Sequence, residues 1–111
     1  MKARILHNPR CSKSREALAI LKDAGADVEV VEYLKDAPSA GELRRLYEKA
    51  GMSPRDGLRT AEPGAKLLRD ADDATLLEAM ASDPILIERP LVETEKGVRL
   101  GRPPERVREI L

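Results

Sequence analysis

The sequence predicts a single α/β domain, residues 1–111, in which a central mixed β-sheet carries an inserted all-helical middle segment. Two observations support this prediction. The chain has 111 residues, which is enough for one hydrophobic core and too few for two. Its apolar residues alternate between strand-like and helix-like patterns near both ends, while the stretch from about 38 to 83 predicts only helices.

The first elements form a βαβ unit. Residues 3–6 and 28–33 are short apolar runs typical of strands, the second rich in β-branched side chains. Between them, four apolar residues repeat at helical spacing: Ala17, Leu18, Leu21 and Ala24. Gly25 follows, where a helix commonly ends in a left-handed residue. The two strands should therefore be parallel, joined by a right-handed connection.

The middle of the chain contains several helix starts. Ser39 and Glu42 have the spacing of a capping box, and the apolar stripe that follows ends at Gly51. Ser53 and Pro54 begin another helix, because proline is favoured at the first helical position. The segments "AEPGAKLL" and "DATLLEAMAS" predict two more short helices.

The C-terminal part returns to strands. The runs "ILIE" and "LVET" flank Arg89 and Pro90, and "EKG" predicts a turn into "VRL", so residues 91–100 should form an antiparallel hairpin. The last segment, "RPPERVREIL", predicts a helix that begins with proline. No linker, repeat or low-complexity segment interrupts this order.

Charge and composition exclude several classes of function. Twenty basic residues balance twenty acidic ones, with a sequence pI near 6.6, so no global field favours nucleic acid or an anionic membrane. No apolar run approaches the roughly 20 residues of a membrane span, and the N-terminus lacks the apolar segment of a signal peptide. Together with a single cysteine, these features predict a cytoplasmic protein, which we expect to be a monomer.

Cys11 is the only cysteine, and it follows a predicted strand and precedes a predicted helix. A lone cysteine is more often a small buried apolar residue than a nucleophile. At the start of a helix, however, unpaired backbone N–H groups and the helix dipole favour the thiolate. Such surroundings lower a thiol pKa from about 8.5 to about 3.5–7.5. Because the chain has no second cysteine, any other thiol must come from another molecule.

The residues around Cys11 strengthen the prediction of an anion-binding loop with a nucleophile. Four of them add positive charge: His7, Arg10, Lys13 and Arg15. We assign catalytic roles to Cys11, His7 and Ser14, and substrate binding to Asn8 and Arg15. A structural role is the alternative for His7, at a strand end, and for Ser14, at a helix start. One Cys and one His cannot supply a four-ligand zinc site, so we expect neither a metal nor a bound cofactor.

The chain resembles the glutaredoxin-coupled arsenate reductase family in the motif "HNPRCSKSR", in its helical middle, and in "LIERPLV" and "GRPPE". The resemblance covers essentially the whole chain and implies a thioredoxin-like fold with Cys11 as the nucleophile. It also implies three oxyanion-binding arginines: Arg59 in "GLRT", Arg89 in "ERPL" and Arg102 in "GRPP". In thioredoxin-like folds the proline before the antiparallel strand has a cis peptide bond; the sequence alone leaves the Arg89–Pro90 isomer open.

The resemblance also implies a reaction. The Cys11 thiolate attacks arsenate and displaces water, glutathione attacks next as co-substrate, and glutaredoxin resolves the glutathione-linked intermediate before arsenite leaves. Arginine suits this substrate, because a planar guanidinium engages the oxygens of a tetrahedral dianion in pairs. Arg89 and Arg102 each precede a proline, which restricts their backbone to extended conformations.

Two other functions remain open. A glutathione-dependent thiol/disulfide reductase would keep Cys11 without requiring three converging arginines. A non-enzymatic adaptor that binds RNA polymerase is the second alternative, because relatives with this fold act in that way. Those adaptors typically have a C-x-x-C pair, whereas the residue three positions after Cys11 is Ser14.

Overall fold

A computed structural model describes all 111 residues, and the chain divides into two compact units. We call Met1–Asp36 with Arg89–Leu111 the sheet unit, and Ala37–Glu88 the helical unit. The helical segment thus has slightly wider bounds than the residues 38–83 that the sequence predicts. None of the helices combines the length and the apolar character that crossing a membrane requires.

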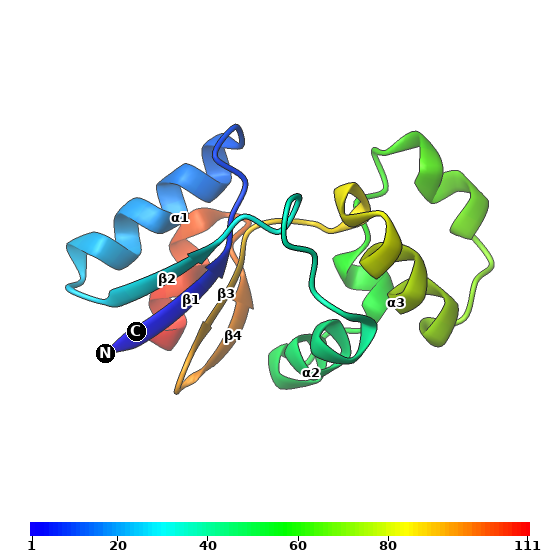
Figure 1. Ribbon diagram of the computed structural model, residues 1–111. Helices are drawn as coiled ribbons and strands as arrows, with labels where there is room; N and C mark the ends of the chain where they lie inside the picture. The colour runs from blue at the N-terminus through cyan, green and yellow to red at the C-terminus, as the bar shows by residue number, and fades with distance from the viewer. The chain divides into compact units, whose positions relative to one another are not determined.

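The sheet unit contains a four-stranded mixed sheet of strand order β2-β1-β3-β4 (Figure 1). Its elements are β1 (Lys2–Leu6), α1 (Ser12–Asp23), β2 (Asp27–Val31), β3 (Leu91–Thr94), β4 (Gly97–Leu100) and the 3₁₀ helix η4 (Pro104–Ile110). Strands β1 and β2 are parallel, whereas β3 is antiparallel to both β1 and β4. The predicted mixed sheet, βαβ unit and C-terminal hairpin are therefore confirmed.

The core of the sheet unit lies on the face of the sheet that α1 and η4 cover (Figure 1). It is entirely aliphatic: Ala3, Ile5, Ala17, Leu21, Val92, Val107 and Ile110. The prediction that Ala24 shares the buried face is wrong, because α1 ends at Asp23 and Ala24 is its exposed C-cap. Gly25 has the expected left-handed backbone, with φ of 78°.

The helical unit contains two α-helices and three 3₁₀ helices. These are α2 (Ala40–Ala50), η1 (Pro54–Gly57), η2 (Pro63–Leu68), α3 (Asp73–Ser82) and η3 (Pro84–Leu86). The side chain of Ser39 accepts a hydrogen bond from the Glu42 N–H at the start of α2, as predicted. Ser53 also caps a helix through a full capping box with Asp56, but that helix is a single 3₁₀ turn.

Candidate active site

The register of the sheet brings three chain segments together at one end of its strands. Leu6 at the end of β1 pairs with Leu91 at the start of β3, and Leu91 pairs with Leu100 at the end of β4. The residues after β1, before β3 and after β4 therefore meet there, at the edge where α1 begins (Figure 1). These segments carry Cys11, Arg89 and Arg102, respectively.

Two hydrogen bonds join the segments that carry Arg89 and Arg102. Arg89–Pro90 and Arg102–Pro103 are both cis peptide bonds, and the second was not anticipated from the sequence. The Gly101 N–H donates to the Pro90 carbonyl at 2.8 Å, and Arg102 Nη1 donates to the Arg89 carbonyl at 3.3 Å. A Cβ atom at Gly101 would lie 2.9 Å from Pro90 Cγ, so only glycine allows this approach. The contact holds both arginines at the same edge of the sheet.

Cys11 is the N-cap of α1, with extended backbone angles of −92° and 121°. Its N–H donates to the Asn8 carbonyl at 3.0 Å, and its side chain is buried. Burial raises the pKa of the Cys11 thiol, but the backbone N–H groups of Ser14 and Lys13 and the Arg89 guanidinium together bring that pKa below its ordinary value. The direction agrees with the sequence-based prediction of a thiol with increased thiolate character, while the role of Cys11 as a nucleophile stays a prediction.

His7 and Ser14 form a buried hydrogen-bonded pair beside Cys11. His7 Nδ1 lies 2.6 Å from Ser14 Oγ, which also accepts the Asn8 N–H at 3.0 Å. The His7 N–H donates to the Val31 carbonyl at 2.8 Å and extends the pairing of β1 with β2 by one residue. Ser14 is fully buried and His7 nearly so. The pair therefore ties the end of β1 to the first turn of α1, where the thiol lies.

The charge that we assigned to His7 is wrong. Burial lowers the pKa of the imidazole, and the positive charges of Arg15 and Lys22 act in the same direction. Glu32 raises this pKa but does not outweigh burial. A lowered pKa favours the neutral imidazole at neutral pH. In the structure His7 is the hydrogen-bonding partner of Ser14, and a catalytic role for either residue stays a prediction.

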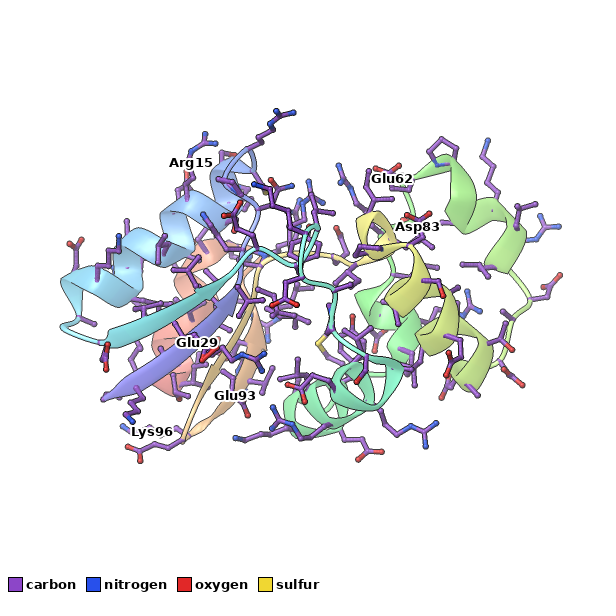
Figure 2. All side chains as sticks on the ribbon, in the orientation of Figure 1. Arg15, Glu29, Glu62, Asp83, Glu93 and Lys96 are labelled. Atoms are coloured by element: carbon purple, nitrogen blue, oxygen red, sulfur yellow. The ribbon has the colours of Figure 1, made fainter.

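Asn8 and Arg15 both hold the loop that leads to Cys11. Asn8 Oδ1 accepts the Arg10 N–H at 3.0 Å, which closes a tight turn, and Arg15 Nη1 donates to the Pro9 carbonyl at 2.9 Å. Arg15 projects from the first turns of α1 (Figure 2). These contacts explain the shape of the loop, while a substrate-binding role for either residue stays a prediction.

Arg59 belongs to the helical unit. Its N–H donates to the Leu86 carbonyl at 2.7 Å, and its guanidinium pairs with the Glu62 carboxylate at 3.4 Å. Arg89 and Arg102, by contrast, lie in the sheet unit with Cys11. The membership of Arg59 in an oxyanion site therefore also stays a prediction.

Sequence reasoning missed the residues that follow β2. Glu32, Leu34 and Lys35 line a hollow together with loop residues 7–10. The signal was available, because the carboxyl ends of two parallel strands meet at one edge of a sheet. No group of three or more His, Cys, Asp or Glu side chains in the chain is arranged to hold a metal ion.

Comparison with known proteins agrees with this architecture. The ArsC family model matches residues 6–110. An arsenate reductase of Rhizobium meliloti is 45% identical over 100% of this chain and 82% of its own length, and the uncharacterised protein YfgD of Escherichia coli is 46% identical over 97% and 95%. The solved structure of an arsenate reductase from Vibrio cholerae is 46% identical and covers 100% of this chain and 98% of its own, with a TM-score of 0.94.

A mixed sheet of this order, with a cysteine at the start of its first helix and a cis-proline before its antiparallel strand, defines the class of thioredoxin-like proteins. Within that class, the chain belongs to the ArsC family.

Proposed function

We propose that this protein is an arsenate reductase that uses Cys11 as its nucleophile and takes electrons from glutathione and glutaredoxin. The observation that carries the proposal is the Cys11 thiol, whose pKa is lowered in part by the Arg89 guanidinium. Arg102 is hydrogen-bonded to Arg89 beside it. The arsenate reductases among its relatives, at 40–45% identity, support the choice of substrate.

The first step is attack of the Cys11 thiolate on arsenic. A sulfur–arsenic bond forms, one arsenate oxygen takes up two protons and leaves as water, and arsenic stays As(V). Negative charge builds on the oxygens during this exchange. The guanidinium groups of Arg89 and Arg102 supply charge-assisted hydrogen bonds for these oxygens, and Arg59 is the third residue proposed for this role.

Reduction needs two electrons that the chain cannot supply, since Cys11 is its only cysteine. A glutathione thiol therefore bonds to the arsenic of the ester and displaces a second water. A glutaredoxin thiolate then attacks the glutathione sulfur, and the glutathione–arsenic bond breaks with its electron pair left on arsenic, now As(III). Water finally releases arsenite and restores the Cys11 thiolate. These thiols are abundant in a reducing compartment, so the proposal includes a cytoplasmic location.

A coupled assay tests the proposal. Oxidation of NADPH is followed in the presence of glutathione, glutaredoxin and glutathione reductase, with arsenate as the last addition. We expect arsenate-dependent oxidation that disappears in Cys11→Ser. If the full mixture ignores arsenate, while the protein with glutathione and glutathione reductase but no glutaredoxin reduces a glutathione mixed disulfide, the protein is a thiol/disulfide reductase instead.

A further inference from the structure

The hollow beside the Cys11 loop has no part in the first step of the proposed reaction. Its volume is about 390 Å³, within the range of about 300–1,000 Å³ that small-molecule pockets occupy. One wall consists of loop residues 7–10, which lead directly into Cys11, and the other consists of residues that follow β2. All of them belong to the sheet unit.

Three charged side chains surround this hollow. The Arg10 guanidinium is exposed and makes no hydrogen bond or ion pair within the chain. The Lys35 Nζ and Glu32 Oε1 atoms are 3.8 Å apart, a long contact between two solvated groups. Leu34, 44% exposed, adds an apolar surface to the lining of the hollow. With His7 neutral, the lining carries two positive charges and one negative charge.

Two positive charges and one negative charge do not suit an oxyanion alone, because the Glu32 carboxylate would repel it. It suits an elongated zwitterion with two carboxylates and one ammonium group. Glutathione has these three groups, with a thiol between its two ends. We propose that this hollow is the glutathione site, where Arg10 and Lys35 bind the two carboxylates and Glu32 binds the γ-glutamyl ammonium group. The part that the glutathione thiol plays there rests on the proposed function.

The position explains why glutathione is the second reactant. A tripeptide held by its two ends against residues 7–10 presents its central thiol to the arsenic ester on the next residue of the loop, Cys11. The sulfur then bonds to arsenic while one arsenic oxygen leaves as water with the thiol proton and the ester proton. Arsenic is not reduced until the external glutaredoxin thiolate attacks the glutathione sulfur. Since arsenate is already bonded to Cys11, holding the glutathione thiol near arsenic turns a reaction between two molecules into a step within one complex.

A binding experiment tests the site without any arsenate chemistry. S-methylglutathione, which has no free thiol, is titrated into the ¹⁵N-labelled protein. We expect the largest amide shifts at Arg10, Glu32, Leu34 and Lys35. Each of Arg10→Ala and Glu32→Gln should weaken binding by about three- to tenfold, the scale of one charge-assisted contact at a solvated site. Arg108→Ala, an exposed arginine on η4 outside the hollow, is the matched control and should bind as the wild type does.

Kinetics separate this inference from the proposed function. In the coupled assay, Arg10→Ala and Glu32→Gln should raise the KM for glutathione by the same factor while leaving the KM for arsenate unchanged. If arsenate is reduced but neither the shifts nor the glutathione KM depends on these residues, the site is wrong and the function stands. If S-methylglutathione binds here but the wild type reduces no arsenate, the site stands and the proposed substrate is wrong.

Discussion

At Cys11, burial and hydrogen bonding act on the thiol pKa in opposite directions. Burial alone would make this residue an inert apolar side chain, which is the common fate of a lone cysteine. The outcome depends on a few donors: two backbone N–H groups of the first turn of α1 and the Arg89 guanidinium. These donors come from two segments that are far apart in the sequence.

The rate of Cys11 alkylation by iodoacetamide should report this balance. Because the pKa is lowered, the rate should rise with pH through a midpoint below the free-cysteine value of about 8.5. Arg89→Ala removes a positive charge and a donor, so its midpoint should move upward, whereas Arg108→Ala should leave it in place. A wild-type midpoint at or above 8.5 would contradict the proposed activation.

Comparing arsenate reduction with Cys11 alkylation distinguishes oxyanion binding by an arginine from activation of the thiol. Alanine at Arg89 or Arg102 should lower kcat/KM for arsenate by about 10²–10³, the usual loss for one oxyanion donor. Lysine should restore only part of it, because an ammonium group keeps the charge without the planar fork. Alkylation at saturating pH, which has no oxyanion to bind, should change little. Arsenate turnover near the wild-type level in Arg59→Ala, or in either other variant, would remove that arginine from the site.

At the scale of elements, helix α2 shows how local signals define boundaries. Its N-cap Ser39 accepts from Glu42, and Gly51 ends it with a left-handed backbone of φ 70°. An added Cβ atom meets no neighbour at Gly51, so any cost of a side chain there arises from the backbone. Both boundaries agree with the sequence because each depends on one or two adjacent residues.

Two glycines of this helix provide a matched pair of variants. Gly51→Ala should lower the free energy of unfolding by about 1 kcal/mol, because a left-handed backbone is unfavourable for a residue with Cβ. Gly41→Ala, inside the helix with only Ser39 Oγ within 4 Å, should raise it by up to about 1 kcal/mol. Urea denaturation followed by circular dichroism measures both. Equal effects of the two substitutions would contradict this reading of the Gly51 conformation.

At the scale of the whole molecule, the proposed function assigns a two-electron reduction to a chain with a single thiol. The chain offers neither a second cysteine nor a cluster of ligands for a redox metal. In the proposed reaction the electrons therefore come from thiols of other molecules, so we expect turnover to depend on which thiols are present.

Omission of single components should reveal this dependence. We expect multiple turnover only when glutathione is present. Mass spectrometry of a reaction stopped before glutaredoxin is added should find glutathione linked to Cys11 through arsenic. Cys11→Ser should carry no adduct. Full multiple turnover with thioredoxin as the only thiol source would overturn the proposed electron supply.

The sequence by itself determined the elements and the position of Cys11, the proposed nucleophile. Strand periodicity, helix caps and prolines are local signals, so they predict the mixed sheet, the helical middle and Cys11 at the junction of β1 and α1. The tertiary structure decided what surrounds that thiol. Pairing of Leu6 with Leu91 and of Leu91 with Leu100 brings Arg89 and Arg102 to the end of the sheet where Cys11 lies. Burial lowers the pKa of His7, and the parallel pairing of β1 with β2 places Glu32 and Lys35 beside the loop of residues 7–10. Register and burial depend on contacts between distant segments, which no local pattern encodes.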